Sequence, residues 1–369
     1  MPELLTEQQQ QLRARAADFA VNVLEPERAT EPADARTRVI AAAKLAGLFA
    51  MTQPKAHGGS AASALELTLV RDELSAHNPP YLDTVFGPGP GVLANAGEPI
   101  ESRYLAPLLA GEKRGAFGFT EPDDAPNPTR GELRDHELII NGQKSYVTGG
   151  AAADFINTLV QIDGHGPALV VIDTDAAGVV LERTFSSLDG SHHAAFRFDE
   201  VHVPEGHIIG KPGEGMPRAM RQIGDTRLAI AARCVGTMRW VLGYLTDHLE
   251  KPDRSGKPRG NKEGVRLRYA DLRIKTYAAR SMLYRTARIA DTGANVINEA
   301  IACKVFATET VADVVDTAIQ LVGGTALHDD HPLAILFKQV RALRLAEGGS
   351  DVLRLNLARG RLELAKGVL

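Results

Sequence analysis

The sequence lacks several features that define common protein classes. Only two of its 369 residues, Cys234 and Cys303, are cysteines, which argues against a disulfide scaffold and favours a reducing compartment. No apolar run reaches the length that crosses a membrane, and the first residues lack the basic-then-apolar order of a signal peptide. We therefore expect a soluble, cytoplasmic protein with no membrane partner.

Net charge and nucleotide-binding motifs are also missing. Lys and Arg total 42 against 46 Asp and Glu, so the formal charge of -4 gives no electrostatic case for nucleic-acid binding. No G-x-G-x-x-G follows a predicted strand, and no G-x-x-x-x-G-K occurs, so nicotinamide and P-loop chemistry lack their usual signs. The run from His328 to His331 resembles a metal cluster, but its place in a polar loop before Pro332 favours no metal site.

Residues 1–112 have the periodicity of helices. Thr6 can cap a helix whose apolar residues Leu12, Ala16 and Phe19 recur at spacings of three and four. Further helices are predicted before Leu48, after the Gly58-Gly59 turn and from Ile100 to Leu109, with a Pro- and Gly-rich loop over 78–91. We predict an N-terminal helical domain.

Near Arg114 the period changes to that of strands. The run 138–140 leads through Asn141-Gly142 to 143–148, which predicts a two-residue hairpin. Residues 155–162, 168–172 and 196–203 are rich in β-branched or aromatic residues or alternate with polar ones. Residues 113–215 are therefore predicted to form a central β-domain.

Helical periodicity returns at Met216 and continues to the end of the chain. Four long helices are predicted over 216–247, 264–290, 296–322 and 351–366, the third ending at Gly323-Gly324. Short turns between long helices favour an antiparallel four-helix bundle over 216–369. The order of helices, strands and helices indicates an α+β fold and differs from βαβ alternation.

Four segments then carry a family resemblance. They are Gly-Ala-Phe-Gly-Phe-Thr-Glu-Pro at 115–122, Asn-Gly-Gln-Lys-Ser-Tyr-Val-Thr at 141–148, Gln-Leu-Val-Gly-Gly at 320–324 and Ala-Glu-Gly-Gly-Ser at 346–350. In this order the chain resembles the acyl-CoA dehydrogenase family from roughly Leu45 to the C-terminus. The resemblance implies FAD as cofactor, an acyl-CoA thioester as substrate, a role in fatty-acid metabolism and α,β-dehydrogenation of the acyl chain.

The resemblance makes Glu347 the candidate catalytic base. In this chemistry a carboxylate removes the α-proton while the flavin N5 atom accepts the β-hydride. Some family members carry the base on an earlier helix, where this chain has Thr226, and a threonine cannot replace a carboxylate. Without the resemblance, a glutamate before Gly348 would be read as a solvated loop residue.

The same resemblance supplies candidate binding residues. Those for the cofactor are Phe117, Phe119, Thr120, Tyr146, Thr148, Gln320, Gly323, Gly324 and Gly349. Those for the substrate are Arg227 and Ala346, although Arg227 could equally form an ion pair on a helix surface. Hydroxyls can bond the polar edge of the flavin ring, and an aromatic side chain can cover its face.

Several positions depart from the family pattern. The segment Asp123–Thr129 replaces a Gly- and Ser-rich phosphate loop, with Thr129 as a possible replacement for the serine. Pro252 and Ser255 stand where an Arg and a Phe usually reach the FAD of a neighbouring subunit. These departures leave two alternatives open: a partner-dependent or flavin-deficient subunit of a heteromeric dehydrogenase, and an oxygen-using acyl-CoA oxidase or flavin monooxygenase.

Partners also follow from the resemblance. An electron-transferring flavoprotein is the expected electron acceptor. Family members share cofactor contacts between chains, so a homotetramer or homodimer is expected, or a heterotetramer with a paralogous subunit.

Overall fold

The computed structural model describes residues 4–367, which pack into two compact units. One unit comprises the residues up to Met51, Ala62–Phe86 and the residues from Gly224 onward, and the other comprises Thr52–Ala61 and Gly87–Ile223. Residues 1–3, part of the argument against a signal peptide, lie outside the described chain. Among the described helices, none is both long and apolar enough to span a bilayer. The two boundaries between the three domains drawn from the sequence stay a prediction.

The N-terminal helices of the first unit are α1 (Glu7–Phe19), α2 (Pro32–Leu45) and α3 (Ala64–Ser75). As predicted, Thr6 caps α1, and Gln9 completes a capping box with it. Ser63 caps α3 in the same way with Glu66. The apolar faces of these helices share one core, which includes Leu12, Phe19, Val39, Leu48, Val70 and Leu74.

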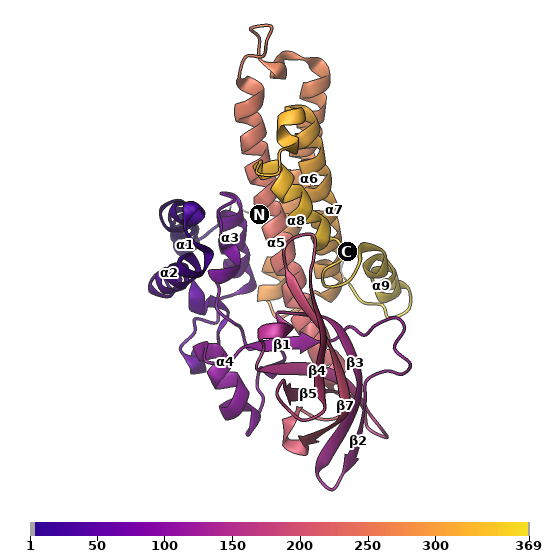
Figure 1. Ribbon diagram of the computed structural model, residues 1–369. Helices are drawn as coiled ribbons and strands as arrows, with labels where there is room; N and C mark the ends of the chain where they lie inside the picture. The colour runs from indigo at the N-terminus through magenta and orange to yellow at the C-terminus, as the bar shows by residue number, and fades with distance from the viewer. Residues whose placement is uncertain (1–3, 368–369) are drawn as a thin grey trace. The chain divides into compact units, whose positions relative to one another are not determined.

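Five helices follow in the C-terminal part of the chain. They are α5 (Gly215–Glu250), α6 (Glu263–Asp291), α7 (Ile297–Val322), α8 (Pro332–Leu343) and α9 (Ser350–Leu362). Figure 1 shows α7 lying against the long helix α6 and the shorter helix α8. Residues from α5 to α8 share a core with Leu65 and Leu69 of α3. The predicted bundle is present, with α8 as an element that the sequence patterns did not reveal.

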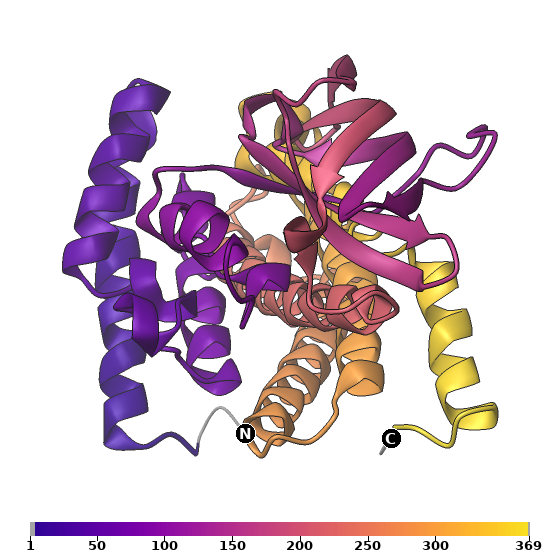
Figure 2. The same cartoon turned by 90° about the horizontal axis from the view of Figure 1, so that it is seen from below.

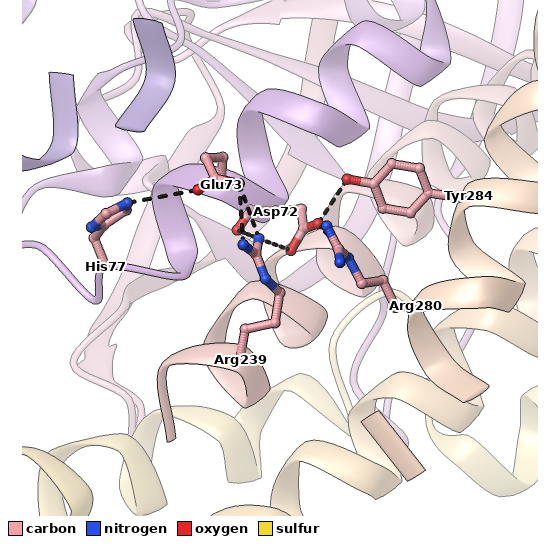
Figure 3. A network of polar contacts seen from close by, with 6 residues as sticks. All are labelled: Asp72, Glu73, His77, Arg239, Arg280 and Tyr284. Atoms are coloured by element: carbon pink, nitrogen blue, oxygen red, sulfur yellow. Dashed lines mark hydrogen bonds and ion pairs between the residues drawn. The ribbon is translucent and has the colours of Figure 1, made fainter. Parts of the chain in front are cut away.

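A buried polar network ties α3 to the bundle. Asp72 on α3 is 0% exposed, and its carboxylate lies 2.9 Å from Arg239 Nη1 on α5 and 3.2 Å from Arg280 Nε on α6. The Tyr284 hydroxyl donates to the same carboxylate at 2.7 Å, and Glu73 binds Arg239 at 3.2 Å. Figure 3 shows these side chains converging between the three helices.

The second unit is built on an eight-stranded sheet. Its strands are β1 (Gly115–Gly118), β2 (Arg130–Arg134), β3 (Glu137–Thr148), β4 (Phe155–Ile162), β5 (Gly166–Asp173), β6 (Val179–Ser186), β7 (His192–Pro204) and β8 (Ile208–Ile209). The order is β6-β7-β3-β2-β4-β5-β8, and β1 pairs with β4 in parallel. Most pairings are antiparallel, and Figure 2 shows the strands from below.

Successive residues along β4 and β5 supply two apolar cores. Ile156 and Ile172 belong to one core, whereas their neighbours Phe155 and Val171 belong to the other. The second core also contains Leu105, Leu108 and Leu109 from the segment around α4 (Ala106–Ala110). This alternation is what a strand buried on both faces requires.

The hairpin predicted at Asn141-Gly142 is wrong. Both residues lie inside β3, which continues from Glu137 to Thr148 with a bulge between Ile140 and Gly142. Gly142 has φ +148°, and a Cβ there would lie 2.5 Å from Thr129 Cα. The glycine is therefore needed for the close approach of the Thr129 backbone rather than for a chain reversal.

Candidate functional site

The candidate base stands on a tight turn between α8 and α9. Glu347 has φ +54° and Gly348 φ +104°, so two consecutive residues lie in the left-handed region. The Ala346 amide donates to Ala342 O at 3.1 Å, and the Ser350 amide closes the turn on Arg344 O at 3.2 Å. A left-handed glutamate costs about 1–3 kcal/mol and persists only where its surroundings fix it. The turn holds the Glu347 side chain half-buried.

Two buried cations bond the backbone of this turn. Arg227 on α5 is 6% exposed, and its Nε donates to Glu347 O at 3.1 Å. Lys304 on α7 is 0% exposed, and its Nζ donates to Arg344 O at 3.2 Å and to Gly348 O at 2.8 Å. The carbonyl oxygens of Arg344, Glu347 and Gly348 thus all accept hydrogen bonds from positively charged side chains.

Burial and neighbouring charges shift the pKa of the Glu347 carboxyl in opposite directions. Burial raises its pKa above the ordinary glutamate value, while the charges of Arg227 and Lys304 act in the opposite direction. Burial also lowers the pKa of Lys304 to about 8. A carboxyl with a raised pKa binds and releases a proton closer to neutral pH, as a general base or acid requires.

The turn brings together some of the residues predicted from the sequence. Ala346 and Gly349 flank Glu347 and Gly348 in it, and Gly349 precedes the first residue of α9. Arg227 contacts the turn from α5 and is buried, so its interpretation as a surface ion pair is wrong. Sequence reasoning missed Lys304. Its one available sign was a lone lysine on an apolar helical face beside Ile301 and Val305.

The predicted Gln-x-x-Gly-Gly turn lies at the far end of α7. Roughly 24 Å of helix separates Gln320 from Lys304, at 1.5 Å per residue. Gly323 follows the helix with φ +94°, and Arg259 donates to the carbonyls of Leu321 (3.2 Å) and Val322 (3.0 Å). Gln320, Gly323 and Gly324 therefore do not join Glu347 within this unit.

The sheet unit holds the aromatic and hydroxyl candidates. Phe117 and Phe119 stack at 5.8 Å between ring centroids and are partly buried. On β3, Tyr146 is 59% exposed with φ +52°, and its ring packs edge-on against Phe185 at 5.0 Å. Thr120 and Thr148 are exposed, and the Thr148 hydroxyl lies 3.2 Å from a nitrogen of His193. The exposed ring of Tyr146 and the exposed hydroxyls of Thr120 and Thr148 are thus available on β3 and in the segment after β1.

An ion pair between Lys144 and Glu121 links the segments 141–148 and 115–122. Lys144 is 1% exposed, and its Nζ lies 2.6 Å from a carboxylate oxygen of Glu121. The same oxygen accepts the Thr129 amide at 2.9 Å, and the Thr129 hydroxyl donates to Gln143 O at 3.1 Å. Thr129 is therefore buried in the sheet, and the structure does not favour it as a replacement phosphate ligand.

The histidine run before α8 is part of a helix cap. His331 precedes α8, its Nδ1 accepts the Leu333 amide at 3.2 Å, and its Nε2 lies 2.9 Å from the Tyr244 hydroxyl. Between residues 4 and 367 no group of three His, Cys, Asp or Glu side chains could hold a metal ion. The other histidine pair, His192 and His193, begins β7.

Comparison with known families decides the identity of the fold. A model of the acyl-CoA dehydrogenase N-terminal domain matches residues 6–112, and a model of the acyl-CoA dehydrogenase C-terminal domain matches residues 213–362. The chain belongs to the acyl-CoA dehydrogenase family. The resemblance drawn from the four motifs and the predicted α+β fold are confirmed.

Individual relatives cover nearly the whole chain. An acyl-CoA dehydrogenase of Bacillus subtilis is 26% identical over 85% of this chain and 86% of its own length. A subunit of the caffeyl-CoA reductase–Etf complex of Acetobacterium woodii is 25% identical over 94% and 96%. The structure of acyl-CoA dehydrogenase from Geobacillus kaustophilus superposes with a TM-score of 0.82 at 21% identity, over 96% and 98% of the two chains. Family membership makes this chain an oxidoreductase of the acyl-CoA dehydrogenase type.

Proposed function

We propose that this protein oxidises the Cα–Cβ bond of an acyl-CoA thioester with FAD as cofactor and Glu347 as the base. One observation carries the proposal: the half-buried Glu347 carboxyl stands on a left-handed turn with a raised pKa. A residue in this conformation is costly for folding stability, and such strain clusters at functional sites.

The oxidation removes a proton from Cα and a hydride from Cβ of the acyl chain. The Cα–H bond breaks and its proton passes to a carboxylate oxygen of Glu347. The β-hydrogen leaves with its electron pair as a hydride, and the Cα–Cβ double bond forms. FAD, when bound, supplies the acceptor for that hydride at its N5 atom. Glu347 must therefore be ionised before the oxidation begins.

The residues of the sheet unit fit a flavin ring. Tyr146 offers an exposed aromatic face, and Thr120 and Thr148 offer exposed hydroxyls. An aromatic face and hydroxyl donors are the groups that a planar heterocycle with a polar edge requires. We propose that Phe117 and Phe119 back this surface, and that Gln320, Gly323, Gly324 and Gly349 complete cofactor contacts in an oligomer.

The reverse reaction is a second candidate. The relative from Acetobacterium woodii is a subunit of a reductase complex, and burial shifts the pKa of Glu347 upward, in the direction that helps a proton donor. A protonated Glu347 would return a proton to Cα of an α,β-unsaturated acyl-CoA, and Cβ would accept the hydride that reduced FAD supplies when it is bound. Both directions use the same residues, so the equilibrium of substrates and the electron partner would set the direction.

We also propose the partners of the reaction. The Acetobacterium relative belongs to a complex with Etf, which supports an electron-transferring flavoprotein as the electron carrier. A homotetramer or homodimer would bring the two ends of α7 from different chains to one cofactor. Cys234 and Cys303 are free and buried, which supports a reducing cytoplasmic location.

The first experiment is the flavin-to-chain ratio and the visible spectrum of the purified protein. One FAD per chain, bleached anaerobically by an acyl-CoA, supports a self-sufficient dehydrogenase. A folded protein with a ratio near one half or zero favours a partner-dependent subunit instead. Rapid reoxidation of the bleached flavin by air would favour an oxygen-using relative.

The second experiment tests Glu347 directly. Glu347→Gln should retain the flavin spectrum and lose bleaching by at least about 10²-fold, because a positioned base contributes roughly 10²–10⁴. The matched control is Glu112→Gln, which removes an exposed carboxylate near the end of α4. Parent-like bleaching in Glu347→Gln would remove this residue from the mechanism.

A further inference from the structure

The buried ammonium of Lys304 makes an unusual set of contacts. It lies on α7 one turn after Ile301 and directly before Val305, both of which are buried apolar residues. Its two acceptors are backbone carbonyls, of Arg344 at 3.2 Å and Gly348 at 2.8 Å. Burying a charged lysine costs free energy unless its N–H groups are bonded, so the side chain needs these carbonyls.

Those carbonyls belong to the two ends of the Glu347 turn. Arg344 follows α8, and Gly348 directly follows Glu347. Arg344 O also accepts the Ser350 amide, so the lysine and the start of α9 share one acceptor. A single cation therefore spans the turn from its first residue to the residue after the carboxylate.

We propose that Lys304 is a positioning residue that fixes the left-handed turn and thereby aims the Glu347 carboxylate. The proposal rests on the proposed role of Glu347 as base. Lys304 acts through the backbone and does not itself touch the reacting atoms. Arg227 complements it by holding Glu347 O, so that removal of Lys304 leaves one of the two anchors in place.

The charge of Lys304 also acts on the carboxyl. The charged or titratable groups around it are Arg227 and Cys234 from α5, Glu309 from its own helix and Glu347 from the turn. Arg227 and Lys304 both lower the pKa of Glu347 against the effect of burial. Loss of the lysine charge should therefore raise the pKa of Glu347 further, so that a higher pH is needed to ionise the base.

The experiment compares Lys304→Met with a control on the same helix, Thr308→Val. Thr308 is buried, and its hydroxyl bonds Val305 O within α7. In Lys304→Met, amide exchange at Ser350 should accelerate by about tenfold or more, because a bond to a charged donor is lost. The rate constant of flavin bleaching should fall by up to roughly 10²-fold. Its pH midpoint should move upward, with little change in KM.

Lys304→Gln separates geometry from charge. Its amide can still donate to a carbonyl, so it should restore part of the Ser350 protection while keeping the raised pH midpoint. A folded Lys304→Met with parent-like Ser350 exchange and an unshifted pH midpoint would overturn the proposal. The same would follow if Thr308→Val produced equal changes, since the effect would then be one of helix packing.

If neither variant folds, hydrogen exchange of the Ser350 amide in the parent protein is compared at pH 7 and at pH 9.5. The rates are corrected for the intrinsic pH dependence of amide exchange. Protection that falls at the turn alone supports the role, and unchanged protection overturns it. Amide exchange is measured without substrate. If Lys304→Met loosens the turn while Glu347→Gln bleaches normally, Glu347 is rejected as the base, and the contact between Lys304 and the turn stands.

Discussion

Gly236 on α5 faces the backbone of Asp72 on α3 so closely that a Cβ at position 236 would lie 2.3 Å from Asp72 O. The same Cβ would lie 2.5 Å from Ser75 Cβ. The two helices therefore meet through a residue without a side chain. This close approach is what allows Arg239, three residues along α5, to reach the Asp72 carboxylate at 2.9 Å.

Gly236→Ala should destabilise the protein despite the better helix propensity of alanine. The added methyl group must push α3 away, and such overpacking costs about 1–3 kcal/mol. Gly243→Ala is the matched control on the same helix, since it is exposed and no atom lies within 4 Å of the new Cβ. The control should gain about 0.5–1 kcal/mol. Urea unfolding curves of both variants measure the difference, and equal shifts would contradict the close contact.

Asp72→Asn should lower the free energy of unfolding more than most substitutions of a charged residue. It leaves Arg239 and Arg280 without their buried carboxylate, and breaking a buried pair from one side costs about 3–5 kcal/mol. Asp313→Asn breaks a half-exposed pair with Lys275 and should cost about 0–1 kcal/mol. A similar loss of unfolding free energy in both variants would show that the network in Figure 3 adds no special stability.

Lys144→Met should weaken both the sheet and flavin retention. Glu121 would keep a charge without its partner, but its side chain is 28% exposed, so water reduces the loss to about 1–3 kcal/mol. Lys144 also bonds Phe119 O at 3.4 Å, so the segment before Glu121 should loosen. Arg134→Met, from an exposed pair on β2, is the control. Adding Glu121→Gln to Lys144→Met should recover part of the stability, and no recovery would argue against the ion pair.

Unfolding free energy should depend on pH through Glu347. Because burial raises its pKa in the folded protein, the folded state binds the proton more tightly than the unfolded chain does. The contribution of Glu347 to stability is therefore full below the unfolded pKa and declines as pH rises through the folded pKa. Denaturation at several pH values should show this decline in the parent and lose it in Glu347→Gln. An unchanged pH slope in the variant would mean that the carboxyl is not perturbed.

The flavin-bleaching rate should respond to the same ionisation with the opposite sign. The oxidation needs the carboxylate form, so the rate should rise with pH and level off above the folded pKa of Glu347. The midpoint should exceed the ordinary glutamate value of 4.5. Stopped-flow measurements at saturating acyl-CoA report it, and a midpoint below that value would contradict the effect of burial.

The long helices were predictable because their apolar spacing is regular and their ends carry glycine or capping residues. Thr6 and the Gly323-Gly324 stop are examples. Helix α8 was missed because it follows the polar His328–His331 run and begins at Pro332. Strand β6 was missed because it lies at the edge of the sheet, with mostly exposed residues and no alternating pattern. Asn141-Gly142 has the local chemistry of a hairpin, yet pairing on both sides of β3 decides its conformation.

The candidate base came from a short motif and Arg227 from the family resemblance, whereas Lys304 and the contacts that both cations make with the turn were not predicted. Lys304 and Arg227 approach the Glu347 turn from other helices, 44 and 120 residues distant from their acceptors Gly348 and Glu347. Such contacts depend on how α5 and α7 pack, and no local pattern encodes them. Glu121 and Lys144 are similar, because both motifs were assigned to the cofactor although these two residues bond each other.

The Asp72 network also constrains how the protein can be made. Asp72 and Tyr284 are separated by 212 residues, so at about 5–20 residues per second a ribosome needs roughly 10–40 s to deliver the last partner. Until α5 has been synthesised, the Asp72 carboxylate lacks Arg239, and Leu65 and Leu69 lack the helices that share their core. The sheet is encoded between these partners and can close first. The Asp72 network therefore cannot be completed until α6 has been synthesised.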